Sequence, residues 1–259
     1  MEKKDPRVIE KKAYDFLVES KYEDAFHAFR EAGDLYSAAG SHKESSLCFS
    51  SAASCWALRQ GEKVLQNAAI SYESAASEAE KAGDYEYASL LYRYAAINYE
   101  KDMEFAKYSE CFFASKESQR RYLMFSVFNP KRIHNISTGK GHKWTHSIIK
   151  RTYHWLGLTF AAMLWGHGER PMRTFLFAIF IIFAMASLYT FGRLEADNEV
   201  FRPNIFSAMY FSAITFTTVG YGDINPIGLT RALAMVEAFC GVFITPLFIV
   251  GMSRKYLRV

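Results

Sequence analysis

A run of twenty apolar residues sets the strongest limit on how this chain can fold. Residues 172–191 read MRTFLFAIFIIFAMASLYTF and carry one charge, close to the start. A helix needs about 20 apolar residues to cross the hydrocarbon core of a bilayer. A helix of this length in a soluble core would show a polar face, and this run barely shows one. The sequence therefore predicts an outer transmembrane helix over residues 172–191.

A second apolar run, residues 229–252, predicts an inner transmembrane helix. It is long enough to span a bilayer but includes Arg231, Glu237, Gly241 and Pro246. Polar residues inside a membrane helix usually face a protein interior or a water-filled cavity. We therefore expect this helix to pack in a bundle and to line a cavity.

Between the two predicted spans, residues 204–217 are apolar but too few to cross the membrane. A helix of this length rises about 21 Å, less than the roughly 30 Å of the hydrocarbon core. A short helix that enters the membrane and returns fits better. Irregular backbone after such a helix is tolerated only where protein buries it or water reaches it. The following segment is therefore expected to line a protein interior or a pore.

The distribution of charge predicts the orientation. Lys and Arg are concentrated in residues 131–173, where Glu169 is the one acid, and they recur at Arg254, Lys255 and Arg258. Loops rich in Lys and Arg tend to stay on the cytoplasmic side. We therefore expect a two-span protein of the cell membrane with both termini in the cytoplasm. Positive charge beside the apolar segments fits a membrane surface and not nucleic acid.

The return segment, residues 215–228, reads TFTTVGYGDINPIG and has the chemistry of a cation pathway. A dehydrated cation needs a cage of oxygen atoms, which backbone carbonyls supply if successive carbonyls point the same way. Extended chain alternates its carbonyls, so some residues must adopt backbone angles that only glycine adopts at little cost. Gly220 and Gly222 meet this need, and the Thr218 hydroxyl can add one oxygen layer. The short helix directs the partial negative charge of its C-terminal end toward the pore.

Residues 218–223, TVGYGD, resemble the selectivity filter of potassium channels. The approach SAMYFSAITFT and the inner helix, with Glu237 and Gly241, are similar to those of two-transmembrane potassium channels. The segment WGHGERP resembles a motif before the outer helix in some prokaryotic members. The resemblance covers about residues 145–255 and implies a pore domain over residues 166–255.

The resemblance implies K+ as the permeant ion and no organic cofactor. Asp223 is expected behind the filter or at its outer mouth. Some of these channels carry a carboxylate where Ile214 stands here, so their inactivation behaviour does not transfer. Since one chain supplies a quarter of the cage, a homotetramer is implied. The implied ion-binding residues are those of the filter, with K+ held by the carbonyls of the first four and the Thr218 hydroxyl: Thr218, Val219, Gly220, Tyr221, Gly222 and Asp223.

Two residues of the inner helix are candidates for gating. Gly241 lies near its middle, and Pro246 removes a backbone hydrogen bond and favours a kink. Gly241 is either a hinge or a site of close helix packing, since small residues are common at membrane helix contacts. The candidates for the cavity wall are Phe243, Thr245 and Phe248.

Residues 6–125 predict a cytosolic helical repeat domain. Three helix-sized units end in Gly40, Gly61 and Gly83, and Ala-Ala pairs recur with Tyr or Phe nearby. Such units give helix pairs of roughly 40 residues, the period of helical solenoids. AFHAFREAGDLYSAAG and AAISYESAASEAEKAGD resemble the tetratricopeptide-type solenoid of soluble NSF attachment proteins. The predicted fold class is thus all-α: a helical-hairpin solenoid followed by a two-transmembrane-helix pore domain with a re-entrant pore helix and a selectivity filter.

The repeat domain has two possible roles. Solenoids present a concave face to a peptide or protein, so the domain can bind an unknown protein or small-molecule ligand that regulates the pore. Alternatively, its helices only drive assembly or spacing, because repeat folds host many roles.

Residues 126–154 form a basic linker that marks the boundary between the two domains. About residues 144–165, aromatic and apolar residues alternate with basic ones, and the segment resembles an amphipathic helix on the inner leaflet. Anionic lipid attracts such a helix. The histidines of this region are either interfacial polar residues or sensors of acid: His134, His142, His146, His154 and His167.

Two functions are compatible with these features. The first is a potassium-selective channel, a homotetramer that passes K+ passively and is regulated or assembled through its repeat domain. The second is a membrane-anchored, non-conducting scaffold that binds partners through the repeat domain. The intact TVGYGD motif favours the channel. We do not expect an enzyme, since the sequence offers no nucleophile–base arrangement and no phosphate-binding loop.

Overall fold

The computed structural model describes residues 5–57, 64–129 and 144–256, and most of them are helical. The chain is all-α, as predicted, apart from one small sheet. It divides into two compact units on either side of the boundary between Phe160 and Ala161. Each unit is described separately below.

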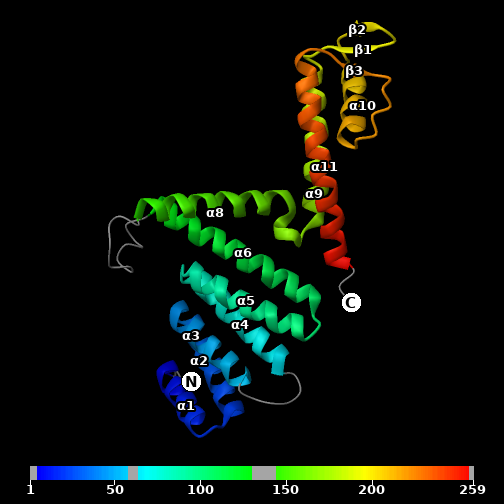
Figure 1. The fold of residues 1–259 in the computed structure, drawn as a ribbon. Helices are drawn as coiled ribbons and strands as arrows, with labels where there is room; N and C mark the ends of the chain where they lie inside the picture. The colour runs from blue at the N-terminus through cyan, green and yellow to red at the C-terminus, as the bar shows by residue number, and fades with distance from the viewer. Residues whose placement is uncertain (1–4, 58–63, 130–143, 257–259) are drawn as a thin grey trace. The chain divides into compact units, whose positions relative to one another are not determined.

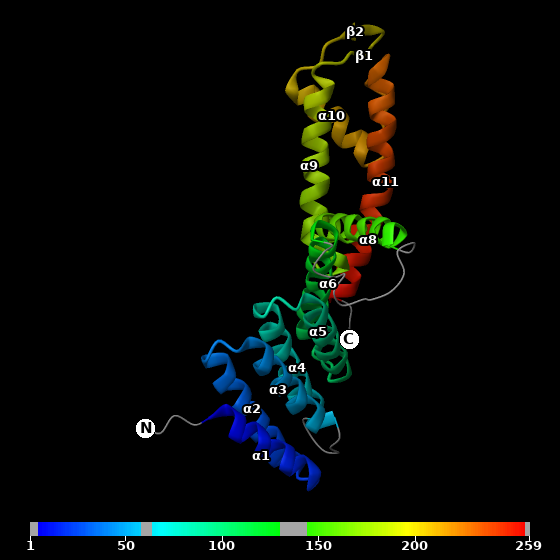
Figure 2. The same ribbon diagram turned by 90° about the vertical axis from the view of Figure 1, so that its left-hand side faces the viewer.

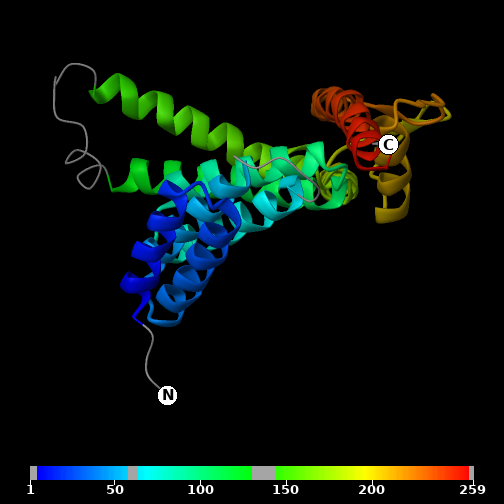
Figure 3. The same cartoon turned by 90° about the horizontal axis from the view of Figure 1, so that it is seen from below.

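The first unit is an array of helical hairpins. Each helix packs mainly against the next one along the chain, and Figures 1 and 3 show them stacked in chain order. The described helices of this array are α1 (Pro6–Val18), α2 (Tyr22–Ala38), α3 (His42–Ala57), α4 (Val64–Lys81), α5 (Tyr85–Lys101) and α6 (Phe105–Phe128).

Small residues allow these helices to approach closely. Alanines from α1 to α5 are fully buried, and aromatic rings fill the space between them. At Gly33 a Cβ would lie 3.0 Å from the ring of Phe49, so the contact between α2 and α3 requires glycine there. The Ala-Ala pairs of the sequence therefore mark helix contacts, because a larger side chain would separate the backbones.

Four described helix ends of the first unit share one geometry. At each, a residue with positive φ follows the helix, and the next amide donates to the carbonyl five residues earlier, as in a Schellman motif. The residues with positive φ are Ser20, Gly40, Gly83 and Met103. The corresponding amides and carbonyls are those of Lys21 and Phe16, Ser41 and Tyr36, Asp84 and Ala79, and Glu104 and Tyr99. Glycine thus marks only some of the repeat ends.

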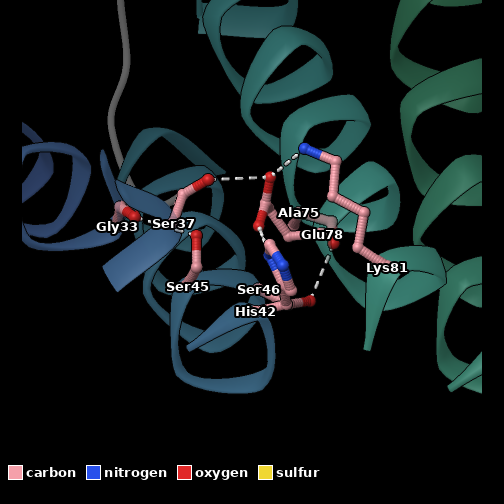
Figure 4. A network of polar contacts seen from close by, with 8 residues as sticks. All are labelled: Gly33, Ser37, His42, Ser45, Ser46, Ala75, Glu78 and Lys81. Carbon is pink, nitrogen blue, oxygen red and sulfur yellow. Dashed lines mark hydrogen bonds and ion pairs between the residues drawn. The ribbon is translucent and has the colours of Figure 1, made fainter. Parts of the chain in front are cut away.

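A buried carboxylate joins α2, α3 and α4 (Figure 4). Glu78 is 5% exposed and accepts hydrogen bonds from Ser37 Oγ at 3.1 Å, His42 Nδ1 at 2.8 Å and Lys81 Nζ at 2.7 Å. Burial by itself raises the pKa of Glu78, but the hydrogen bonds from Lys81, His42 and Ser37 outweigh it and hold this pKa below its ordinary value.

The second unit holds two long apolar helices with a short one between them. α9 (Pro171–Tyr189) and α11 (Leu229–Tyr256) are long and apolar enough to span a membrane, and α10 (Ile205–Phe216) is the short helix. A 3₁₀ turn, η1 (Gly166–Gly168), precedes α9. The sequence predicted these three helices at 172–191, 229–252 and 204–217.

A small antiparallel sheet lies between α9 and α11 in the chain and was not predicted. Its order is β2–β1–β3, formed by β1 (Leu194–Ala196), β2 (Glu199–Phe201) and β3 (Asn225–Pro226). Leu194 pairs with Phe201 on one side and Pro226 on the other. Asp197 and Asn198 both have positive φ, as a tight hairpin turn requires, and these two residue types tolerate it well. The Asp197-Asn198 dipeptide was the feature of the sequence from which this hairpin turn could have been predicted.

The boundary between the units differs from the predicted linker at residues 126–154. Within that range, residues 130–143 lie outside the described part of the chain. α8 (Trp144–Trp165) continues the first unit up to Phe160, and within that unit the Trp155 ring contacts Phe128 of α6 edge-on at 5.8 Å. Most of this helix therefore belongs to the first unit.

The geometry of the helix ends predicts that Met103→Gly stabilises the protein by about 0.5–1 kcal/mol. Met103 adopts a φ of 61° and is 77% exposed, so the change removes backbone strain and little burial. Thermal unfolding of the full chain in detergent measures the effect. Met103→Ala keeps the strained Cβ and is the matched control. Equal midpoints for the two variants would contradict the prediction.

The Glu78 network predicts an acid-dependent loss of stability. Because the pKa of Glu78 is lowered in the folded chain, its contribution is fully present above its ordinary value of 4.5 and is lost as the pH falls through the folded value. Glu78→Gln should cost about 1–3 kcal/mol at neutral pH and flatten the acid limb of an unfolding-versus-pH curve. Glu44→Gln, at an exposed position of α3, should leave the curve unchanged.

Candidate functional site

The short helix α10 lies between the two long helices of the second unit (Figure 2). It begins at an N-cap in which the Asn204 side chain accepts a hydrogen bond from the Ser207 amide at 2.8 Å. Its 12 residues rise about 18 Å, too little to cross a bilayer. Its packing partners are α9 and α11, and its C-terminal end leads into residues 218–223.

The backbone of residues 218–222 has positive φ at every second residue. The values are 58° at Thr218, 52° at Gly220 and 79° at Gly222. An extended strand, with negative φ throughout, points successive carbonyls in opposite directions. Left-handed angles at alternate residues break that alternation, which is the conformation that a column of carbonyl oxygens requires. Gly220 and Gly222, which the sequence analysis singled out, occupy two of these three positions.

Thr218 is the feature of this loop that the sequence argument missed. A β-branched residue with positive φ is a genuine outlier, and holding it there costs about 1–3 kcal/mol. The surrounding structure must offset that cost. The motif gave no indication of this backbone conformation, since threonine was expected at this position because of its hydroxyl group.

Hydrogen bonds hold the loop to the pore helix at both ends. The amides of Val219 and Gly220 donate to the Ile214 carbonyl at 3.0 and 3.2 Å. At the other end, the Tyr210 hydroxyl donates to Asp223 Oδ2 at 2.7 Å. The loop therefore moves with α10, and Tyr210 takes the place of the carboxylate partner that Asp223 lacks in this sequence.

One face of the loop is open in the single chain. Val219 is 53% exposed and Tyr221 is 72% exposed, and a Cβ on Gly220 or Gly222 would meet no atom within 4 Å. Within one chain, neighbouring helices therefore do not cover the Tyr221 ring.

Behind α10, a fully buried carboxyl group connects three helices. The Tyr189 hydroxyl of α9 donates to Glu237 Oε2 at 2.6 Å, and Ser212 Oγ of α10 contacts Glu237 Oε1 of α11. Ser212 Oγ also lies 2.9 Å from the Ile182 carbonyl of α9. The sequence singled out Glu237 but could not name these partners, which come from distant segments.

Gly241 packs against the end of the pore helix. A Cβ built there would lie 1.8 Å from the Phe216 carbonyl oxygen, which no side chain can tolerate. This contact favours close packing over a hinge at Gly241. α11 continues through Pro246, whose missing N–H leaves the Val242 carbonyl without its helical donor.

The cavity-wall candidates on α11 do not share one face. Phe248 packs against Phe175 of α9 with ring centroids 5.9 Å apart. Within one chain Phe248 therefore has a partner on the outer helix, and its place in a cavity wall stays a prediction. Phe243 and Thr245 are exposed in the single chain and stay candidates.

The last turns of α11 contact the corner that precedes α9. Arg254 lies 3.8 Å from the Glu169 carboxylate, whose side chain is 2% exposed. A Cβ on Gly168 would lie 2.9 Å from the Arg254 guanidinium, and one on Gly251 would lie 3.2 Å from Pro171. The WGHGERP segment thus provides close contacts for the end of the inner helix. The sequence argument had treated it only as a motif.

Two cavities lie near candidate functional residues. One of about 540 Å³ borders the end of the loop at Gly222 and is lined by polar groups including Asp197, Asp223 and Arg231. The other, of about 630 Å³, lies in the helical array beside Leu47 and Leu90. Among the described residues no cluster of His, Cys, Asp and Glu could hold a metal ion.

Comparison with known proteins identifies the second unit. Residues 174–258 match the family model of an ion channel. This match supports an ion channel pore domain. With the two apolar helices, it also supports a membrane protein of two spans that transports ions.

Two curated relatives match a shorter part of the chain. Protein LctB of Bacillus caldotenax is 46% identical over 43 residues, and Protein LctB of Geobacillus stearothermophilus is 44% identical over 43 residues. These alignments cover 17% of this chain and 31% of each relative, so the chain spans about a third of their length. No solved structure matches the chain significantly.

The contact at Gly241 predicts that Gly241→Ala disrupts the second unit. The added Cβ must push α11 away from the Phe216 carbonyl, and overpacking of this kind typically costs about 1–3 kcal/mol or more. Thermal unfolding of the assembled protein in detergent measures the loss. Gly251→Ala adds the same methyl group at a looser contact and should be much milder. A stable Gly241→Ala protein with raised ion flux would instead support a hinge.

Proposed function

We propose that the protein is a potassium-selective channel that conducts K+ passively through a homotetrameric pore. The observation that carries this proposal is the loop at residues 218–223. It has positive φ at alternate positions, is bonded to the pore helix at both ends, and reads TVGYGD. The proposed ion ligands are the carbonyls of Thr218, Val219, Gly220 and Tyr221 with the Thr218 hydroxyl.

A homotetramer is supported because one chain supplies only part of an ion cage and leaves one face of the loop uncovered. Carbonyls of one strand can surround only part of an ion, and cages of this type are built from four loops. The open face of the loop and the exposed Tyr221 ring are the surfaces that neighbouring subunits would cover. Gly222 and Asp223 complete the proposed filter, and Phe243 and Thr245 are proposed to line the cavity below it.

The proposed orientation has both termini in the cytoplasm. Lys and Arg before α9 and at the end of α11 support it by the positive-inside tendency. On α8, exposed apolar residues at 149, 153, 156, 160 and 163 follow a helical period, beside the basic Lys150 and Arg151. This stripe suits the surface of a bilayer that contains anionic lipid.

The helical array is proposed to regulate or assemble the pore. Its hairpin architecture is that of protein-binding repeats, and the 630 Å³ cavity beside Leu47 offers a place for an unknown ligand. The ion pair of Glu169 and Arg254 gives α11 a contact with the segment that follows α8. Pro246 is the proposed bend of the gate, since Gly241 is packed against α10.

A matched pair of glycine variants tests the channel. Gly220 and Gly228 both have positive φ, and at either position an added Cβ would meet no atom within 4 Å, but only Gly220 belongs to the filter. In liposomes, Gly220→Ala should lower K+ flux at least tenfold and reduce its ratio to Na+ flux, because the strain of about 1–3 kcal/mol arises in every subunit of the pore. Gly228→Ala should conduct like the unchanged protein.

The scaffold alternative is decided by the same assay. A correctly assembled protein that passes no K+ is either a closed channel or a scaffold. Repeating the measurement after deletion of residues 1–125 separates the two, because only a channel held shut by its repeat domain gains flux.

A further inference from the structure

Three oxygen–oxygen contacts connect Tyr189, Glu237, Ser212 and Ile182, but the two hydroxyl groups among them carry only two protons. The oxygen pairs are Tyr189 Oη with Glu237 Oε2 at 2.6 Å, Ser212 Oγ with Glu237 Oε1, and Ser212 Oγ with the Ile182 carbonyl at 2.9 Å. Each hydrogen bond needs one proton between its two oxygens. A tyrosine and a serine hydroxyl supply one proton each. Three separate two-centre bonds therefore need a third proton, and the carboxyl group is the group that can supply it.

One arrangement satisfies every contact. The Tyr189 hydroxyl donates to Oε2, the carboxylic acid donates from Oε1 to Ser212 Oγ, and the Ser212 hydroxyl donates to the Ile182 carbonyl. That carbonyl can accept this bond beside its helical one because it has two lone pairs. With an ionised carboxylate, the single Ser212 proton would have to be shared between Glu237 Oε1 and the Ile182 carbonyl.

The surroundings of Glu237 suit a neutral acid. Its side chain is fully buried, and among the described residues only the hydroxyls of Tyr189 and Ser212 reach it, with no cation paired to it. Its partner Tyr189 belongs to a buried apolar cluster that takes small residues from all three helices, namely Ala186, Ala208 and Ala234. An isolated carboxylate in such a site would cost several kcal/mol, which protonation avoids.

We propose that Glu237 is a positioning residue of the pore, a neutral carboxylic acid that joins the outer, pore and inner helices behind the filter. The proposal rests on the channel function proposed above for its consequence in conduction, but not for its chemistry. Glu237 touches no permeating ion. It acts through Ser212 on α10, whose Ile214 carbonyl in turn holds the amides of Val219 and Gly220.

Infrared difference spectroscopy of the full-length assembled protein tests the proton directly. A protonated carboxyl group has a carbonyl stretching band separate from the bands of a carboxylate. At neutral pH, Glu237→Gln should lose the acid band, and Tyr189→Phe should shift it, since Oε2 loses its donor. Glu199→Gln, at an exposed position of β2, should lose carboxylate bands instead. Loss of carboxylate bands alone in Glu237→Gln would overturn the proposal.

Ion flux tests the positioning role. Glutamine offers a carbonyl to Tyr189 and an N–H to Ser212, so Glu237→Gln should keep K+ flux within about twofold and preserve its ratio to Na+ flux. Glu237→Ala and Ser212→Ala should each lower that ratio at least threefold in tetramers that still assemble. Ser187→Ala, at an exposed position of α9, is the control. Equal selectivity in all four variants would refute the positioning role.

The two proposals can fail separately. If the unchanged protein carries no K+ under any condition, including after removal of residues 1–125, the channel function fails. The infrared spectra still decide the protonation of Glu237, and tetramer stability then replaces flux as the measure of the helix contact. In that case Glu237→Gln should preserve the thermal midpoint that Glu237→Ala lowers, and a midpoint lowered equally by both would count against the contact.

Discussion

Backbone polar groups at membrane depth must find partners inside the protein, and the second unit is organised by that constraint. α10 is too short to cross a bilayer, so the chain must return through irregular backbone. The return is possible because the Ile214 carbonyl accepts the amides of Val219 and Gly220 and because Tyr210 holds Asp223. α10 can do this only while it is itself fixed between α9 and α11, which is where Glu237 and Gly241 act.

Much of this unit could be predicted because its signals are local in the sequence. Hydropathy and length identify α9 and α11, and length alone identifies α10 as a helix that does not cross. Glycines at positions 220 and 222 indicate positive φ at these two residues, because glycine adopts positive φ at little cost. In the first unit, Gly40 and Gly83 mark helix ends for the same reason. Features encoded within a few residues were therefore accessible to sequence reasoning.

The remaining features depend on contacts between distant segments. The partners of Glu237 lie 48 and 25 residues away, and no periodicity links them. The position of Phe248 depends on how α11 is rotated against α9, which a uniformly apolar helix does not encode. Tertiary structure decides the outcome at both of these positions. At Ser20 and Met103 the reason is local instead, because the hydrogen bonds of the helix end require a positive φ that neither residue type favours.

These contacts divide the inner helix into a fixed part and a free part. Glu237 and Gly241 lie one turn apart on the face that meets α10, so a bend between them would break either the Ser212 contact or the packing on Phe216. Toward the C-terminus, α11 is next held at Gly251 and Arg254, against Pro171 and Glu169. The intervening segment contains Pro246, where the helical hydrogen bonding is already interrupted. For the channel proposed above, a bend in this segment would open the pore and leave the contacts of α10 with Glu237 and Gly241 intact.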